Sequence, residues 1–308
     1  MTMTRLLRFL TTAAALLLFA LPAQAQAADV DIITPHITDA HEIEIPWPTW
    51  PTMHKVVHLP RVATFMLPGT RIEVDMSPTK HVVWMLIAAL TICGLLIFAA
   101  NATNRQTRTV GHAKGFAGGI EAMVLYIRNE VIIPNVGHHG NGFVPFLLTL
   151  FFFILFCNLW GIFPWGSTPT GNIAVTATLA LMTFFVVEAA GIRAQGIGYL
   201  GTIFYWNKDL NIVLRVMLFL ILSPIELLGK FTKPFALTIR LFANMTAGHI
   251  VVLALIGMIF SFKSIASGAP FLMAVAINVL ELFVAFLQAF IFTLLSSVFI
   301  GQIREAHH

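Results

Sequence analysis

The chain has 308 residues, of which 58% are hydrophobic and only 10% are charged, whereas a soluble domain averages about 25% charged residues. With a mean hydropathy of +0.86, this composition excludes an ordinary soluble globule and a disordered chain. It also excludes a nucleic-acid-binding protein, because the formal charge of +4 is scattered and forms no basic run. Cys93 and Cys157 both lie in apolar runs, so the sequence predicts neither a disulfide framework nor a metal site.

The first 80 residues divide into two predicted segments. Residues 1–27 are typical of a cleavable signal peptide, because a basic start and an apolar core precede the small-x-small site at Ala23-Gln24-Ala25. An uncleaved anchor span is the alternative. Residues 28–80 are polar and interrupted by prolines, and we expect them to be exported, with short strands between 62 and 76.

Residues 81–308 are predicted to form a helical membrane domain. Three apolar stretches long enough to cross a bilayer are 82–100, 143–163 and 172–192. Between the first two, residues 116–136 are amphipathic, and we expect a helix there at the membrane surface.

The short loops of this domain alternate in charge. Loops 101–142 and 193–211 contain Lys and Arg, whereas 165–171 contains neither. The positive-inside rule therefore places the two basic loops and the C-terminus in the cytoplasm, and the N-terminus outside.

Two later apolar stretches are too long to cross a membrane upright. Residues 212–260 and 270–303 would form helices of about 73 Å and about 51 Å, against a hydrocarbon core of about 30 Å. Both must tilt strongly, lie partly in the membrane plane or break, and Pro224 and Pro234 are places for a kink. The expected fold is an all-α polytopic membrane protein with upright spans followed by a long, strongly tilted C-terminal helix hairpin.

Polar side chains inside these two stretches are functional candidates, since a bilayer disfavours them. They are Glu226, Lys230, Lys233, Arg240, Asn244, His249, Asn278, Glu281 and Gln288. At about 3.6 residues per turn, Arg240 shares one stripe with Glu226, Lys233 and Asn244. His249 is roughly 180° away from Arg240 around the helix, and Glu281 shares a face of the last helix with Gln288.

A structural reading explains some of these charges. Glu226 and Lys230 have the i,i+4 spacing of a helical ion pair, and Glu188 in the third span is close enough in sequence to pair with Arg193. Arg240 has no acidic residue within one turn, and an arginine at bilayer depth costs roughly 2.5–3.5 kcal/mol. Its counter-ion must therefore come from elsewhere, and another chain is one source.

Arginine and histidine differ in what they contribute to an ion path. Arginine keeps its proton in proteins, so Arg240 is a permanent charge that serves as a barrier rather than a relay. Histidine titrates near neutral pH, and Glu281 is the natural acidic partner of His249. The pattern indicates an ion path with a fixed positive block beside it.

The segment from Lys233 to His249 has the sequence KPFALTIRLFANMTAGH and matches the pattern K-P-x-x-L-x-x-R-L-x-x-N-M-x-x-G. Supporting segments are NLWGIFP at 158–164, TPTGN at 168–172 and LQAFIF at 287–292. Over roughly residues 80–305 the chain resembles subunit a of the F-type ATP synthase.

This resemblance implies a stator subunit in the bacterial inner membrane that couples proton flow to ATP synthesis. Its partners would be a rotating ring of c subunits, the peripheral-stalk b subunits, the rest of the complex and the lipid bilayer. Arg240 would face the ring carboxylate, flanked by Asn244 and Gln288. His249 and Glu281 would line the half-channel from the outside, and Glu226 the cytoplasmic one. No cofactor, nucleic acid or ATP-hydrolysing site is expected on this chain, which has no phosphate-binding loop.

Two features depart from the general pattern of that family. Some bacterial members have Glu at the position of His249 and His at that of Glu281; here the order is that of mitochondrial members, and we expect the two groups to meet in space all the same. The signal-like N-terminus is not a general feature of the family.

The alternative function is a stand-alone proton-coupled transporter or channel, which predicts a complete path within the chain and inverted repeats. A structural scaffold with fortuitous charges would instead tolerate Arg240→Ala. The coupling ion stays open between proton and sodium, with the proton favoured.

Overall fold

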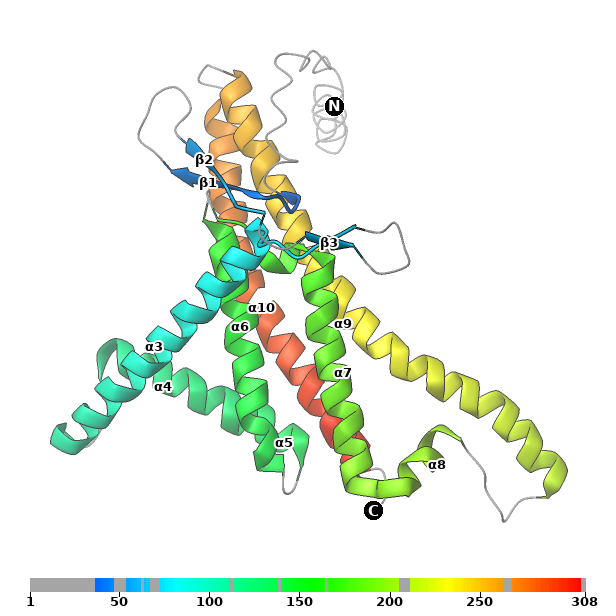
Figure 1. The fold of residues 1–308 in the computed structure, drawn as a ribbon. Coiled ribbons are helices and arrows are strands. Elements are labelled where there is room, and N and C mark those ends of the chain that lie inside the picture. The colour runs from blue at the N-terminus through cyan, green and yellow to red at the C-terminus, as the bar shows by residue number, and fades with distance from the viewer. Residues whose placement is uncertain are drawn as a thin grey trace, which may run out of the picture.

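The computed structural model describes residues 37–46, 54–61, 64–66, 73–110, 114–137, 140–163, 166–204, 211–262 and 267–305 (Figure 1). The long helices are α3 (Lys80–Val110), α6 (Val144–Ile162), α7 (Ile173–Gln195), α9 (Ile212–Phe262) and α10 (Gly268–Glu305). The shorter helical elements are α4 (Gly115–Tyr126), η1 (Ile127–Ile132), α5 (Ile133–Val136), η2 (Gly140–Phe143), η3 (Pro169–Gly171), η4 (Gly196–Gly198) and α8 (Tyr199–Ile203). The strands are β1 (Glu42–Pro46), β2 (His54–His58), β3 (Thr64–Met66) and β4 (Glu73–Asp75).

Within the described residues, five helices are long and apolar enough to cross a membrane. They are the five long helices, and they coincide with the stretches predicted from the sequence. The prediction of a polytopic helical membrane protein with a long C-terminal hairpin is confirmed. Pro224 and Pro234 do not end α9, which continues through both.

Helix α6 lies at the centre of the bundle. It contacts α3 on one side and α10 on the other, and α7 packs against both α9 and α10 (Figure 1). The largest fully buried side chains include Leu147, Phe151, Phe152 and Ile154 of α6. Helix α9 runs obliquely to α6 and α7 before it joins α10 in the hairpin (Figure 1). Only 6% of the residues in the apolar stretch of α9 are buried inside the protein, whereas 50% of those in the stretch that contains α6 are buried.

The two ends of the bundle differ. The strands and the first residues of α3 and α7 lie at one end, which we call the strand end; α5 and α8 lie at the other, the α5–α8 end (Figure 1). The predicted helix over 116–136 is present as α4, η1 and α5 in direct succession. Its π-helical part lies just before Pro134, whose missing N–H and bulky ring disturb the α-helical hydrogen bonds of the preceding turn.

The strands form two separate antiparallel hairpins, β1–β2 and β3–β4. Strands were predicted between 62 and 76, where β3 and β4 lie, but the β1–β2 hairpin was not predicted. The amide of Lys80 donates a hydrogen bond of 2.8 Å to the carbonyl of Ala40, which attaches the segment before β1 to the start of α3. The predicted signal peptide, 1–27, lies outside the described residues.

Candidate functional site

The predicted polar stripe lies on the exposed face of α9. Its four members, all exposed, are Glu226, Lys233, Arg240 and Asn244. The buried face of the same helix includes the apolar side chains of Leu237, Leu241 and Met245. Glu226, Arg240 and Asn244 therefore lie on the side of α9 that faces away from α7 and α10, the helices it packs against. Lys233 reaches back toward α10, where its Nζ lies 4.9 Å from the ring centre of Phe299.

The charge of Arg240 is not balanced within the described part of its own chain. Within the part of the chain that the structure describes, no carboxylate forms an ion pair with its guanidinium. Three exposed small residues lie near it, namely Ala236, Ala243 and Ala247. Small residues allow another helix to approach closely. Because a lone arginine facing lipid is unfavourable, this face requires a partner that covers it and supplies negative charge.

Lys230 is turned the other way and belongs to a separate cluster. Its Nζ lies 3.2 Å from Oε2 of Glu188, and both side chains are largely buried. The hydroxyl of Tyr199 donates a hydrogen bond to Glu188 and accepts one from Lys230. Burial, reinforced by the hydrogen bond to Glu188, raises the pKa of Tyr199, so the hydroxyl stays protonated.

This cluster corrects two pairings suggested by the sequence. Lys230 pairs with Glu188 and not with Glu226, and Glu188 therefore does not depend on Arg193. Spacing within one helix suggested both of the wrong partners, whereas α7 packing against α9 brings together residues that are 42 positions apart.

The acidic and amide groups predicted on the last helix are buried inside the bundle. Glu281 is 6% exposed and Gln288 is 4% exposed. Glu281 lies against Gly248 of α9, where a Cβ atom would be only 2.5 Å from Oε1 of the carboxylate. His249, half-buried, follows Gly248 directly, so the structure brings Glu281 to the turn that carries His249.

A buried amide also contacts this part of α10. Asn158 of α6 is completely buried, and its Nδ2 donates a hydrogen bond of 3.2 Å to the carbonyl of Ala285, one turn after Glu281. Thr170 donates a hydrogen bond of 2.5 Å to Oδ1 of Asn158. In the sequence, Asn158 stood out only as part of a segment that matches the family, although an amide in an otherwise apolar span is a signal in itself.

His249 lines a small cavity at the strand end. The other residues that line it are Ile37, His81, Ser167, Thr168, Gly171, Met245 and Thr246. Sequence reasoning gave none of these a role, because they come from four separate segments. The hydroxyl and imidazole groups make this cavity polar.

The apolar helices form a bundle, and one face of it bears an uncovered permanent cation. Acid, amide and imidazole groups lie behind that face. Together these features define a class of protein. It is a multi-pass membrane protein that moves ions at a contact with another subunit. Residues 82–301 match the protein family described as ATP synthase A chain. The chain belongs to this family.

Relatives support the same assignment over most of the chain. The ATP synthase subunit a of Myxococcus xanthus is 49% identical over 240 residues, which are 76% of this chain and 75% of the relative. That of Chloroherpeton thalassium is 46% identical over 269 residues, 87% of this chain and 74% of the relative. The ATP synthase subunit a 2 of Chlorobaculum tepidum is 44% identical over 292 residues, 92% of this chain and 76% of the relative.

Proposed function

We propose that this chain is the stationary proton-channel subunit of a rotary F-type ATP synthase, with Arg240 facing the carboxylates of a rotating c-subunit ring. The observation that carries the proposal is the position of Arg240. It lies on an exposed, small-residue face of a transmembrane helix, with no anionic partner in the described part of its own chain. A ring of carboxylates that passes this face supplies the missing charge.

The permanent charge of Arg240 gives the contact its mechanism. A nearby cation favours the ionised form of a carboxylic acid, so each ring carboxyl that reaches Arg240 releases its proton. Since arginine does not give up its own proton, it blocks direct proton leakage between two half-channels. The ring must then rotate before the carboxylate is protonated again.

The two half-channels would lie on opposite sides of this block. His249 and Glu281 line the path from the strand end, with Asn244 and Gln288 next to Arg240. Glu226 lies 14 residues before Arg240, about 21 Å along a helix axis, and would line the path to the α5–α8 end. That separation fits two offset half-channels.

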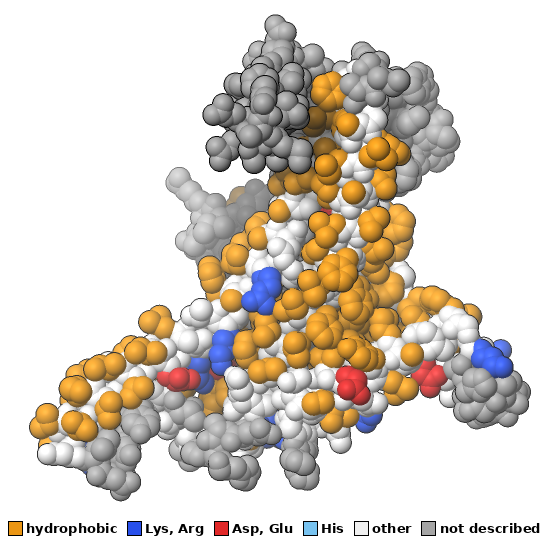
Figure 2. All heavy atoms as spheres, turned by 180° about the vertical axis from the view of Figure 1, so that it is seen from behind, with side chains coloured by type: hydrophobic (Ala, Val, Ile, Leu, Met, Phe, Trp, Pro, Cys, Tyr) orange, Lys and Arg blue, Asp and Glu red, His pale blue; other side chains and the backbone are white. Residues whose placement is uncertain are grey.

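The distribution of charge supports an orientation. Most of the charged side chains visible in Figure 2 lie toward the lower end, below a face that is mostly hydrophobic. The basic residues toward the α5–α8 end are Lys114 just before α4, Arg128 in η1, and Arg193 and Arg304 in the last turns of α7 and α10. By the positive-inside rule this end lies in the cytoplasm and the strand end lies outside. Relatives from bacteria support the plasma membrane as the location.

The remaining partners follow from the subunit's place in the complex. The peripheral-stalk b subunits would hold the chain against rotation, and lipid would cover its other apolar faces. ATP synthesis itself would take place on other subunits. The membrane potential supplies about 2.3 kcal/mol per proton for each 100 mV.

ATP-driven proton pumping in inverted membrane vesicles tests this function. Arg240→Ala should abolish pumping, while ATP hydrolysis by the detached peripheral part and the amount of chain in the membrane stay normal. Arg193→Ala is the matched control, because Arg193 is an exposed arginine at the end of α7, and it should pump normally. Normal coupled pumping by Arg240→Ala would refute the proposal and favour a stand-alone transporter.

A further inference from the structure

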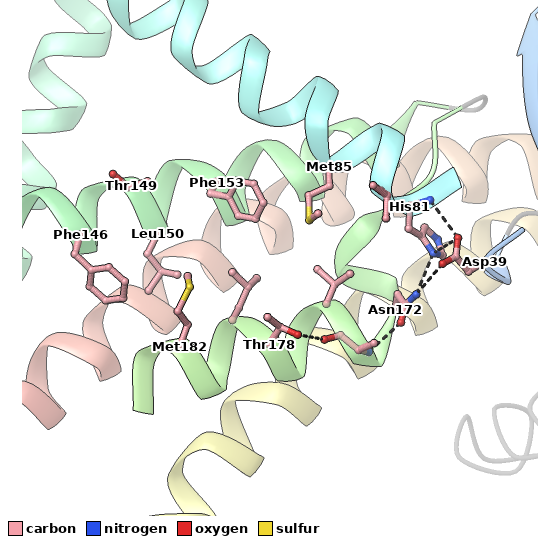
Figure 3. A pocket seen from close by; sticks show the side chains of 14 residues that line it. Asp39, His81, Met85, Phe146, Thr149, Leu150, Phe153, Asn172, Thr178 and Met182 are labelled. Atoms are coloured by element: carbon pink, nitrogen blue, oxygen red, sulfur yellow. Dashed lines mark hydrogen bonds and ion pairs between the residues drawn. The ribbon is translucent and has the colours of Figure 1, made fainter. Parts of the chain in front are cut away.

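A second group of polar side chains lies at the strand end, outside the residues given a role above. His81, in the first turn of α3, has a side chain only 3% exposed, and its Nδ1 lies 3.2 Å from Oδ1 of Asp39. Nδ2 of Asn172 is 3.3 Å from Oδ2 of Asp39 and 3.3 Å from Nδ1 of His81. Figure 3 shows the three side chains converging at one end of an apolar pocket.

The geometry suits either protonation state of the imidazole. Asn172 caps α7 by accepting a hydrogen bond of 2.9 Å from the amide of Ala174, so its NH2 group is the part that points to Asp39 and His81. Nδ1 of His81 therefore has an acceptor on one side, the Asp39 carboxylate, and a donor on the other. A protonated Nδ1 donates to Asp39, and an unprotonated Nδ1 accepts from Asn172.

This group connects water to the interior. The side chain of Asp39 is 29% exposed, whereas that of His81 is buried. His81 also lines the small cavity of about 10 Å³ that His249 lines, a volume close to what one water molecule needs. Ser167, Thr168 and Thr246 line the same cavity. The Oγ atom of Ser167 is buried and has no hydrogen-bond partner among the described residues, so it is available to a water molecule.

We propose that Asp39 and His81, positioned by Asn172, form the outer mouth of the half-channel that leads to His249 and Glu281. Asp39 collects a proton from water, His81 takes it up, and the imidazole passes it to a hydroxyl or a water molecule in the cavity. The imidazole of His81 is then neutral again, and no proton is consumed. The inference rests on the proposed function and adds a first relay to the path.

The electrostatic surroundings of His81 fit such a relay. Asp39 and Lys80 are its charged neighbours at the strand end, and His249 lines the same cavity. The apolar pocket on the other side of His81 is walled by residues such as Phe153, Val175 and Met182. The two hydroxyls in that pocket, those of Thr149 and Thr178, already donate to the carbonyls of Pro145 and Ala174 in their own helices, so the polar cavity is the better route inward.

Passive proton conduction tests the relay directly. Vesicles that contain the whole membrane complex are stripped of the peripheral ATP-hydrolysing part, and a potassium diffusion potential drives protons through them. The variants are His81→Gln and Asp39→Asn, which keep hydrogen-bonding groups but cannot titrate. Since a positioned proton donor typically contributes about 10²-fold and water replaces part of it, each should conduct roughly tenfold more slowly than the unaltered chain.

His58→Gln is the matched control. His58 forms the same kind of pair, 3.1 Å from Glu42, on an exposed hairpin, so its conduction should be unchanged. Conduction at the normal rate by His81→Gln and Asp39→Asn would overturn the inference. If His81→Gln lowers the amount of chain in the membrane, Asp39→Asn decides, because it preserves the shape of the side chain.

The inference and the proposed function can fail separately. Arg240→Ala is measured for ATP-driven pumping in the same series. Lost pumping there, combined with normal conduction in His81→Gln, refutes the outer relay alone. Normal pumping by Arg240→Ala refutes the function on which the relay rests.

Discussion

Gly248 provides the most specific prediction, because it sets the position of Glu281. In Gly248→Ala the new Cβ would lie 2.5 Å from Oε1 of Glu281 and 3.0 Å from its Cγ, where ordinary contact begins only at 3.4 Å. The carboxyl group must therefore retreat by about 0.9 Å, the gap between those contact distances. A displacement near 1 Å in a positioned reacting group lowers rates by as much as about 10²-fold.

We expect Gly248→Ala to reduce passive proton conduction by between about tenfold and about 10²-fold, with the amount of chain nearly unchanged. Alanine favours a helix over glycine by about 1 kcal/mol, so a weaker helix would not explain the loss. Gly257→Ala is the control, since it lies on the same helix and its Cβ would meet nothing within 4 Å. Equal conduction by the two variants would refute the role given to the position of Glu281.

Two other predictions concern paired charges. Lys230→Met removes the cation from a largely buried Glu188 and should destabilise the chain by roughly 3 kcal/mol, measured as thermal unfolding in detergent; adding Glu188→Gln should restore most of the stability, and no recovery would contradict the pairing. The exchange of His249 and Glu281 for each other should conduct better than the worse of His249→Ala and Glu281→Ala, because both groups remain in the same region. An exchanged chain as inactive as the double alanine variant would refute the paired relay.

The membrane helices were predictable because their signal is local. Apolar stretches of about 20 residues or more have few alternatives to a membrane helix, so all five long helices were found from the sequence. The face shared by Glu226 and Arg240 was also predictable, because helical periodicity fixes the direction of each side chain relative to the helix axis. α9 keeps that register through Pro224 and Pro234.

Contacts between helices were not predictable in the same way. Asn158 bonds to Ala285, 127 residues away, and spacing along the chain contains no information about such a contact. The predicted pairing of Lys230 with Glu226 was wrong for the same reason. An i,i+4 spacing suggests an ion pair only when both side chains lie on one uncovered helix face. Packing of α7 on α9 turned Lys230 inward.

The strand end shows a further limit. No local pattern in the sequence indicates the site at this end, because its three residues lie far apart along the chain. The group formed by Asp39, His81 and Asn172 is assembled from three segments by the hydrogen bond that attaches Ala40 to the start of α3 and by the N-cap of α7. Long-range assembly, not local pattern, creates that site.

The central claim is that the Arg240 face of α9 meets the rotor, and disulfide cross-linking tests it most directly. Ala236 and Phe235 are neighbours, both exposed, and they point roughly 100° apart around the helix. Each is changed to cysteine in turn, in a chain whose Cys93 and Cys157 are replaced by alanine, and is oxidised against a cysteine placed beside the carboxylate of the c subunit. We predict that Ala236→Cys cross-links and Phe235→Cys does not. Cross-linking of Phe235→Cys alone would show that another face of α9 meets the ring and would contradict the account.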